Sequence, residues 1–119
     1  MQKISLNFRE GDIVIMELPF TDLIGKKLRP VLVLSSEKLN IISRDLIVTK
    51  ISSSQQLKDF EVKLKPEDLE EGKLKKVSYI HCHSIFTVEK NLIVKKVGRL
   101  KIEKLNKVKI IIKEIFNLS

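Results

Sequence analysis

The 119 residues of the chain are enough for one domain with a hydrophobic core, and too few for two. Hydrophobic residues make up 43% of the chain and charged residues 32%, and no apolar run approaches the roughly 20 residues that a membrane helix needs. This composition excludes a disordered polypeptide and a membrane-spanning protein. Since the amino terminus also lacks the apolar stretch of a signal peptide, we expect a cytoplasmic protein. The single cysteine, Cys82, excludes an internal disulfide bond and argues against a structural zinc site.

The net charge of +8 is distributed unevenly along the chain. Residues 1–72 hold 11 Lys and Arg against 12 Asp and Glu, whereas residues 73–119 hold 12 against 3. This asymmetry predicts that the C-terminal part faces a polyanion or an acidic protein. A lysine-rich surface that serves only solubility is the alternative.

Six segments have the apolar or alternating pattern of β-strands. They are residues 13–20, 29–35, 45–51, 60–64, 77–83 and 91–97. Residues 37–44 read as a polar loop with a possible helical turn, and residues 84–90 as the connection between the last two strands. Residues 66–72 begin with Pro and acidic residues and end with Gly, which predicts one or two helical turns. Gly98 is expected to end the last strand.

The final segment, residues 101–118, is predicted to be a helix. Its apolar residues recur at spacings of three and four: Ile102, Leu105, Val108, Ile112 and Ile115. Further apolar residues widen this stripe, which predicts contact with a second subunit as well as with the sheet. Short strands followed by one C-terminal helix indicate a mainly β fold with α: a small, strongly bent, partly open barrel capped by a helix.

The polar loop between the first two strands is the first candidate site. It carries Thr21, Lys26 and Lys27, and it ends at Arg29, which Pro30 biases towards an extended backbone. An arginine held at the start of a strand beside two lysines is suited to bind a phosphate. The alternative is a surface arginine paired with a nearby carboxylate.

Four stretches of the sequence resemble the MazF/PemK family, the toxins of type II toxin–antitoxin pairs. They are GDIVIMELPFTDLIGKKLRPVLVLS, LIVTKISS, YIHCHSIFTV and KKVGRLKIEKL. The resemblance spans roughly residues 10–106, and the Arg-Pro after the Gly-Asp strand is fairly specific in combination with the late Gly-Arg-Leu. It implies an SH3-like barrel of the CcdB/MazF type that forms a homodimer. It also implies cleavage of single-stranded RNA, including mRNA, at short sequences without a metal or other cofactor, and a cognate antitoxin with an acidic tail that covers the RNA site.

The resemblance also implies roles for particular residues. Arg29 matches the family's motif arginine, which binds phosphate, and Ser52 falls where many members place a catalytic threonine, whose hydroxyl could donate to a phosphate oxygen. Ser53 and Gln55 follow in the same loop, and with Thr21, Lys26 and Lys27 they are candidate RNA contacts. Simple loop serines and a solvated loop are the alternatives.

His81 and His83 depart from the family pattern. In the plasmid-borne branch this strand often carries an arginine and an aspartate two residues apart. On a strand, residues two apart share a face, so both imidazoles should point the same way and could act as base and acid near neutral pH. The alternatives are ordinary solvent-facing residues, or an adventitious metal site that lacks a third ligand. Cys82 should face the opposite side as a buried thiol.

Two other functions remain open from the sequence. A toxin of the same barrel could bind DNA gyrase without cutting RNA, or the chain could be a catalytically inactive SH3-like module that binds nucleic acid or protein. Loss of activity on mutation of Arg29 or the histidines would separate an enzyme from either alternative.

Overall fold

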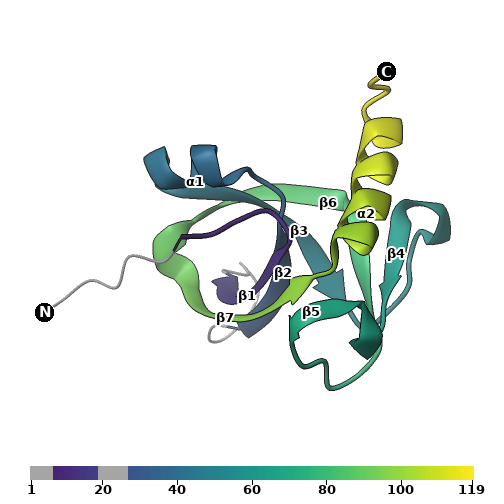
Figure 1. Cartoon of the computed structure of the whole chain (residues 1–119), viewed down its shortest axis with the longest axis horizontal. Coiled ribbons are helices and arrows are strands. Elements are labelled where there is room, and N and C mark those ends of the chain that lie inside the picture. The colour runs from purple at the N-terminus through teal and green to yellow at the C-terminus, as the bar shows by residue number, and fades with distance from the viewer. Residues whose placement is uncertain (1–6, 19–26) are drawn as a thin grey trace, which may run out of the picture.

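The computed structural model describes residues 7–18 and 27–119, which form a curled antiparallel sheet with two α-helices (Figure 1). The elements in chain order are β1 Asp12–Leu18, β2 Lys27–Val33, α1 Glu37–Ile42, β3 Asp45–Ser52, β4 Glu61–Leu64, β5 Leu69–Gly72, β6 Ser78–Glu89, β7 Ile93–Leu100 and α2 Ile102–Ile115. Short 3₁₀ turns at Lys58–Phe60, Pro66–Asp68 and Lys90–Leu92 connect some of the strands. No helix of the described residues is long and apolar enough to cross a membrane.

The seven strands form one sheet in the order β4-β6-β3-β2-β1-β7-β5. Neighbouring strands are antiparallel throughout, and the sheet curls so that α2 lies against β6 and β4, while α1 lies beside β3 (Figure 1). The prediction of a mainly β, partly open barrel with a C-terminal helix is therefore confirmed.

Two hydrophobic cores lie on the two faces of this sheet. In β1, Ile13 belongs to one core and Val14 to the other, and in β2 Leu32 and Val31 are divided in the same way. The first core includes Leu105 and other residues of α2, so it lies between the helix and the sheet. Because successive strand residues point to opposite faces, burial on both faces requires the continuous apolar runs seen in the sequence.

The structure corrects the predicted connection at residues 84–90. β6 runs unbroken from Ser78 to Glu89, and its second half pairs with the first half of β3. The segment is a strand because its β-branched and aromatic residues, such as Ile85 and Phe86, suit a pleated sheet. The turn between the two last strands is only the 3₁₀ turn Lys90–Leu92.

The predicted helical turns at residues 66–72 and the predicted break at Gly98 are also wrong in part. Only Pro66–Asp68 is helical, and Leu69–Gly72 forms the edge strand β5, which pairs with β7. Gly98 lies inside β7, opposite both Ile13 and Gly72. A Cβ atom on Gly72 would lie 2.2 Å from the carbonyl oxygen of Val97, so the glycines here permit two backbones to approach closely.

The other predicted elements agree with the structure within a few residues. The first two strands and the third strand correspond to β1, β2 and β3, although Pro19 and Phe20 at the end of the first lie outside the described residues. The helix predicted at 101–118 is α2, and its Leu105 and Val108 are buried. Helix α1 replaces the possible turn at 37–44, with Ser36 accepting a hydrogen bond from the Leu39 N–H at its start.

Candidate functional site

Strands β3, β6 and β4 place three polar residues in one row across the sheet. β6 places His81 opposite Lys50 of β3 and opposite Glu61 of β4. Directly paired residues share a face of the sheet. The neighbouring row of Ile51, Ile80 and Val62 packs into the core under α2, so the row of His81 lies on the face away from this helix.

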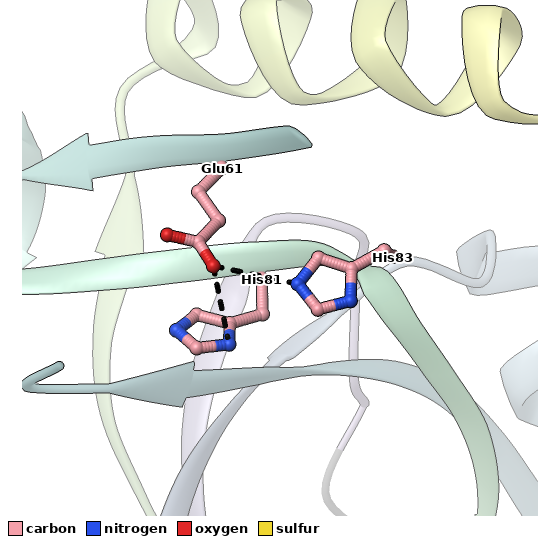
Figure 2. Close-up of side chains that lie close together, drawn as sticks. All are labelled: Glu61, His81 and His83. Atoms are coloured by element: carbon pink, nitrogen blue, oxygen red, sulfur yellow. Dashed lines mark hydrogen bonds and ion pairs between the residues drawn. The ribbon is translucent and has the colours of Figure 1, made fainter. Parts of the chain in front are cut away.

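Glu61 and His81 of this row converge with His83, which lies two residues further along β6 (Figure 2). Glu61 Oε2 lies 3.6 Å from Nδ1 of His81 and 3.4 Å from Nε2 of His83. Figure 2 shows both imidazoles turned towards this single carboxylate oxygen, and the ring centroids are 5.4 Å apart. The prediction that the two histidines share a face is therefore confirmed. The side chains of Glu61 and His81 are completely buried, whereas that of His83 is 24% exposed.

A bulge in β6 sets the position of His83. The register between β3 and β6 shifts between Thr49, which pairs with Ile85, and Lys50, which pairs with His81. The residues between them on β6, including His83, therefore have no partner on β3. The Thr49 hydroxyl lies within hydrogen-bond distance of the carbonyl oxygens of His81 and Ser84 and holds the bulge together. A bulge of this kind redirects a side chain, here that of His83.

The loop after β3 is fastened to the same cluster. The ring nitrogen Nε2 of His81 lies 2.9 Å from the carbonyl oxygen of Ser54. Because a carbonyl oxygen only accepts, this nitrogen carries the proton and donates. The carboxylate of Glu61 accepts the backbone N–H groups of Gln56 and Leu57, at 2.8 Å from the latter. The cluster thus determines the shape of residues 54–57.

Burial and hydrogen bonding act on the pKa of Glu61 in opposite directions. Removal of the carboxyl group from water raises its pKa, whereas the N–H groups of Leu57 and Gln56 and the side chain of His83 lower it. The net result is a pKa below the ordinary value of the group. Glu61 is therefore a carboxylate at neutral pH and places one negative charge between the two imidazoles.

Arg29 and Ser52 lie on the same face as this cluster. In β2, Arg29 is two residues from Val31, which pairs with Lys50, and Ser52 is two residues from Lys50 on β3. Since residues two apart on a strand share a face, the arginine, the hydroxyl and His81 project to one side of the sheet. Arg29 is exposed, and Ser52 Oγ lies 3.2 Å from the Ser54 hydroxyl and accepts the backbone N–H of Ser54.

Three of the five predicted RNA contacts are exposed residues of the described structure, and the other two lie outside it. Lys27 is exposed at the start of β2, on the face of Arg29, and Ser53 and Gln55 are exposed in the loop that follows β3. Thr21 and Lys26 lie outside the described residues. The structure therefore brings Lys27, Arg29 and Ser52 to one face and leaves two of the predicted contacts without a described position.

Cys82 is the buried core thiol that the alternation of β6 predicts. Its side chain is completely buried in the core that contains Ile80 and α2 residues. Burial raises the pKa of the Cys82 thiol to about 12. A thiol of this kind remains protonated and unreactive at neutral pH, so it takes no part in the chemistry on the opposite face.

Glu61 is a residue of the site that the sequence pattern did not predict. The only local signal was the alternation of residues 60–64, which places Glu61 on the face opposite to Val62. This pattern does not reveal which strand lies beside β4. Only the pairing of β4 with β6 brings the carboxylate to the two histidines.

Solved structures of similar fold were found among bacterial toxins. A Mycobacterium tuberculosis toxin, MazF-mt6, is 23% identical, with a TM-score of 0.74 over 91% of this chain and 98% of that one. MazE–MazF from Deinococcus radiodurans gives a TM-score of 0.80 at 16% identity, covering 96% of this chain and 100% of that one. An endoribonuclease in complex with its cognate antitoxin from a mycobacterial species gives 0.77 at 16% identity, over 93% and 96% of the two chains.

At these identities the likeness establishes the fold, and the protein is a small MazF-like β-barrel with a polar site on the face away from its C-terminal helix. A family model described as PemK-like, MazF-like toxin of type II toxin–antitoxin system matches residues 9–116, and the chain therefore belongs to this family. No curated protein sequence matches the chain. Nothing in these comparisons supports the alternatives of a gyrase-binding toxin or an inactive binding module.

Proposed function

We propose that this type II toxin is an endoribonuclease that cleaves single-stranded RNA, including mRNA, at short sequences without using a metal ion. The observation that carries the proposal is the placement of Arg29, Ser52 and the partly exposed His83 on one face of the sheet. These residues supply a fixed cation, a hydroxyl and an imidazole, which can assist transfer of the phosphoryl group from the 5′-oxygen to the adjacent 2′-hydroxyl.

In this reaction the 2′-oxygen attacks phosphorus, the bond to the 5′-oxygen breaks, and the products are a 2′,3′-cyclic phosphate and a 5′-hydroxyl. Arg29 neutralises the charge that develops on the phosphate oxygens, and Ser52 donates a hydrogen bond to one of them. One proton leaves the 2′-oxygen and another reaches the 5′-oxygen. His83 transfers one of these protons because its imidazole is the more exposed of the pair, and solvent water exchanges the other.

His81 has a different proposed role. Its side chain is completely buried and donates to the Ser54 carbonyl oxygen, so it holds the loop that carries Ser53 and Gln55. We therefore treat His81 as a positioning residue, and Lys27, Ser53 and Gln55 as RNA contacts.

The test is cleavage of varied single-stranded RNAs by the purified protein in excess EDTA. Arg29→Ala should lower the rate about 100- to 1000-fold, by analogy with the removal of one transition-state donor, and His83→Ala should also lower it strongly. Arg44→Ala is the matched control, because Arg44 is an exposed arginine at the opposite end of β3 from Ser52. Wild-type protein that cleaves none of these RNAs would contradict the proposal.

The proposed partners follow from the family and from the charge. We propose a cytoplasmic homodimer that is silenced by an antitoxin with an acidic tail, because residues 73–119 carry a strong positive charge. The exposed Ile110 and Phe116 of the C-terminal helix region are the proposed dimer contacts. Light scattering after gel filtration should give twice the mass of one chain, and Ile110→Asp should reduce it.

A further inference from the structure

The cluster of Glu61, His81 and His83 has the geometry of a metal site. One ligand atom from each residue lies within 4.8 Å of the other two. Two imidazoles and one carboxylate form a donor set that binds zinc and related divalent ions, as in zinc sites that keep a fourth position for water. We infer that these three residues bind one zinc-class divalent cation, and that the bound ion silences the proposed RNA-cleaving site by occupying His83.

The distances around Glu61 Oε2 fit a shared cation better than they fit direct hydrogen bonds. Zinc–nitrogen and zinc–oxygen bonds of about 2.1 Å at a tetrahedral angle separate two ligand atoms by about 3.4 Å. The observed separations are 3.4 Å to His83 Nε2 and 3.6 Å to His81 Nδ1. Both are longer than the roughly 2.7–2.9 Å of a charge-assisted hydrogen bond between an imidazolium and a carboxylate.

A buried nitrogen without a hydrogen-bond partner supplies independent support. In the described part of the chain, few buried side-chain nitrogen and oxygen atoms lack a hydrogen-bond partner, and Nδ1 of His81 is one of them. Because Nε2 of the same ring donates to the Ser54 carbonyl oxygen, Nδ1 of the neutral ring carries a lone pair. This lone pair faces the carboxylate of Glu61, and a cation between the two removes their repulsion.

The surroundings of the ligands are those of a metal site. Histidine ligands generally donate their second ring N–H to a carbonyl or carboxylate oxygen, and carboxylate ligands are themselves hydrogen-bonded. His81 donates to Ser54, and Glu61 accepts the N–H groups of Gln56 and Leu57. Two of the three ligands are thereby fixed before any ion arrives, and only the partly exposed His83 has freedom to adjust.

The regulatory half of the inference rests on the proposed function. A metal ion bound to His83 Nε2 leaves the proton of the neutral ring on Nδ1, so Nδ1 has no electron pair to accept a proton from RNA, and the ion adds positive charge where the imidazole must gain a proton. Hard cations behave differently, because magnesium prefers sites made of oxygen atoms and dehydrates reluctantly. We therefore expect silencing by zinc and none by magnesium.

The first experiment measures binding without reference to activity. The full chain, without a histidine tag, is stripped with a chelator and titrated with zinc chloride by calorimetry. Wild type should bind one zinc ion per chain. Glu61→Gln and His83→Ala should each weaken zinc binding by at least about tenfold. Loss of a residue that only hydrogen-bonds to a ligand already lowers metal affinity by about that factor, and loss of a ligand should lower it further. Glu67→Gln is the matched control, because this carboxylate is 68% exposed and is not one of the three clustered ligands.

Folding of each variant is checked by circular dichroism and thermal unfolding. Glu61→Gln retains a neutral oxygen that accepts the backbone N–H groups of the loop, so it removes the negative charge of the ligand while keeping the loop contacts. Zinc should raise the melting temperature of wild type and of Glu67→Gln, and raise that of Glu61→Gln much less. Cobalt should give the visible absorption of a tetrahedral site with no thiolate band, since Cys82 faces away.

The second experiment compares RNA cleavage with zinc, with magnesium and with chelator in each variant. Zinc should inhibit wild type and Glu67→Gln, and the ratio of rates with and without zinc should approach one in Glu61→Gln. Absence of stoichiometric zinc binding to folded wild type would overturn the inference and leave the cluster as a loop anchor. Binding without inhibition would overturn its regulatory half. A protein that binds zinc but never cleaves RNA would instead contradict the proposed function, because the binding experiment does not depend on it.

Discussion

His81 and His83 show how two identical side chains on one strand face acquire different properties. His81 is enclosed by β4 and by the loop after β3, whereas His83 lies in the bulge and retains 24% of its exposure. Both contact the same oxygen of Glu61. The bulge accounts for the difference between the buried imidazole, which holds the loop, and the accessible one. In a regular β-ladder both imidazoles would have paired neighbours on both sides.

A second residue-scale feature is the buried ion pair of Asp12 and Arg99. Asp12 is completely buried, accepts the backbone N–H of Arg9 at 2.9 Å and pairs with Arg99 and with Lys96 at 3.2 Å. Asp12→Ala would leave the guanidinium of Arg99 buried without its main partner. We expect a loss of about 3–5 kcal/mol in the free energy of unfolding, measured by urea denaturation.

The matched control for this prediction is Glu70→Gln. Glu70 also approaches Arg99, at 3.9 Å, but its side chain is 61% exposed. An exposed pair of this kind contributes about 0–1 kcal/mol, so its loss should change the unfolding curve little. Equal effects from the two variants would show that burial of Asp12 does not determine the strength of the pair.

At the scale of elements, the close approach of β5 and β7 closes one edge of the sheet. Gly72 has φ of 90°, a backbone conformation that residues with a Cβ rarely adopt, and it lies opposite Gly98. β5 joins the last strand before α2, so this edge also positions the start of the helix through the hydrogen bond from Lys101 N–H to the Asp68 carbonyl oxygen.

Gly72→Ala should therefore be strongly destabilising. The added methyl group would collide with the carbonyl oxygen of Val97, and the positive φ adds backbone strain of about 1–3 kcal/mol. We expect a lower melting temperature by circular dichroism, whereas the exposed neighbouring substitution Lys73→Ala should leave it nearly unchanged. A Gly72→Ala protein as stable as wild type would mean that β5 does not pack against β7 in this way.

At the scale of the whole molecule, the net charge of +8 favours a polyanion. Much of it lies in residues 73–119, which form β6, β7 and α2, while Lys27 and Arg29 place further charge beside the proposed site. Binding of single-stranded RNA should therefore weaken as salt is added, with a slope of log affinity against log salt of about −0.7 for each phosphate contacted.

Lys27→Ala tests whether this charge acts at the proposed site. With an RNA whose 2′-hydroxyls are methylated, so that cleavage cannot occur, the salt slope should become shallower by about 0.7. Lys38→Ala, on the exposed helix α1, should leave the slope as in wild type. Affinity is measured by fluorescence anisotropy over a range of salt, and the same slope in both variants would place the bound RNA elsewhere.

Features that depend on residues close together in the chain could be predicted from the sequence alone. The apolar runs predicted β1, β2 and β3, the spacing of Leu105 and Val108 predicted α2, and alternation placed Cys82 on the face opposite to both histidines. These predictions succeeded because helix and strand periods are local properties of the backbone. The order of the elements predicted a bent, partly open barrel, and the family resemblance, which the match over residues 9–116 confirms, identified it as the MazF type.

Contacts between residues that are distant in the chain depend instead on the three-dimensional packing of the strands. The continuity of β6, the strand β5 and the bulge at His83 depend on pairing with β3 and β7, and the local pattern does not show which strands pair or in which register. Glu61 joins the histidines because burial of Val62 and Ile80 under α2 fixes the register of β4 on β6, and this register turns the carboxylate to the other face. The sequence therefore determined the elements and their faces, while core packing decided the register that assembles the site.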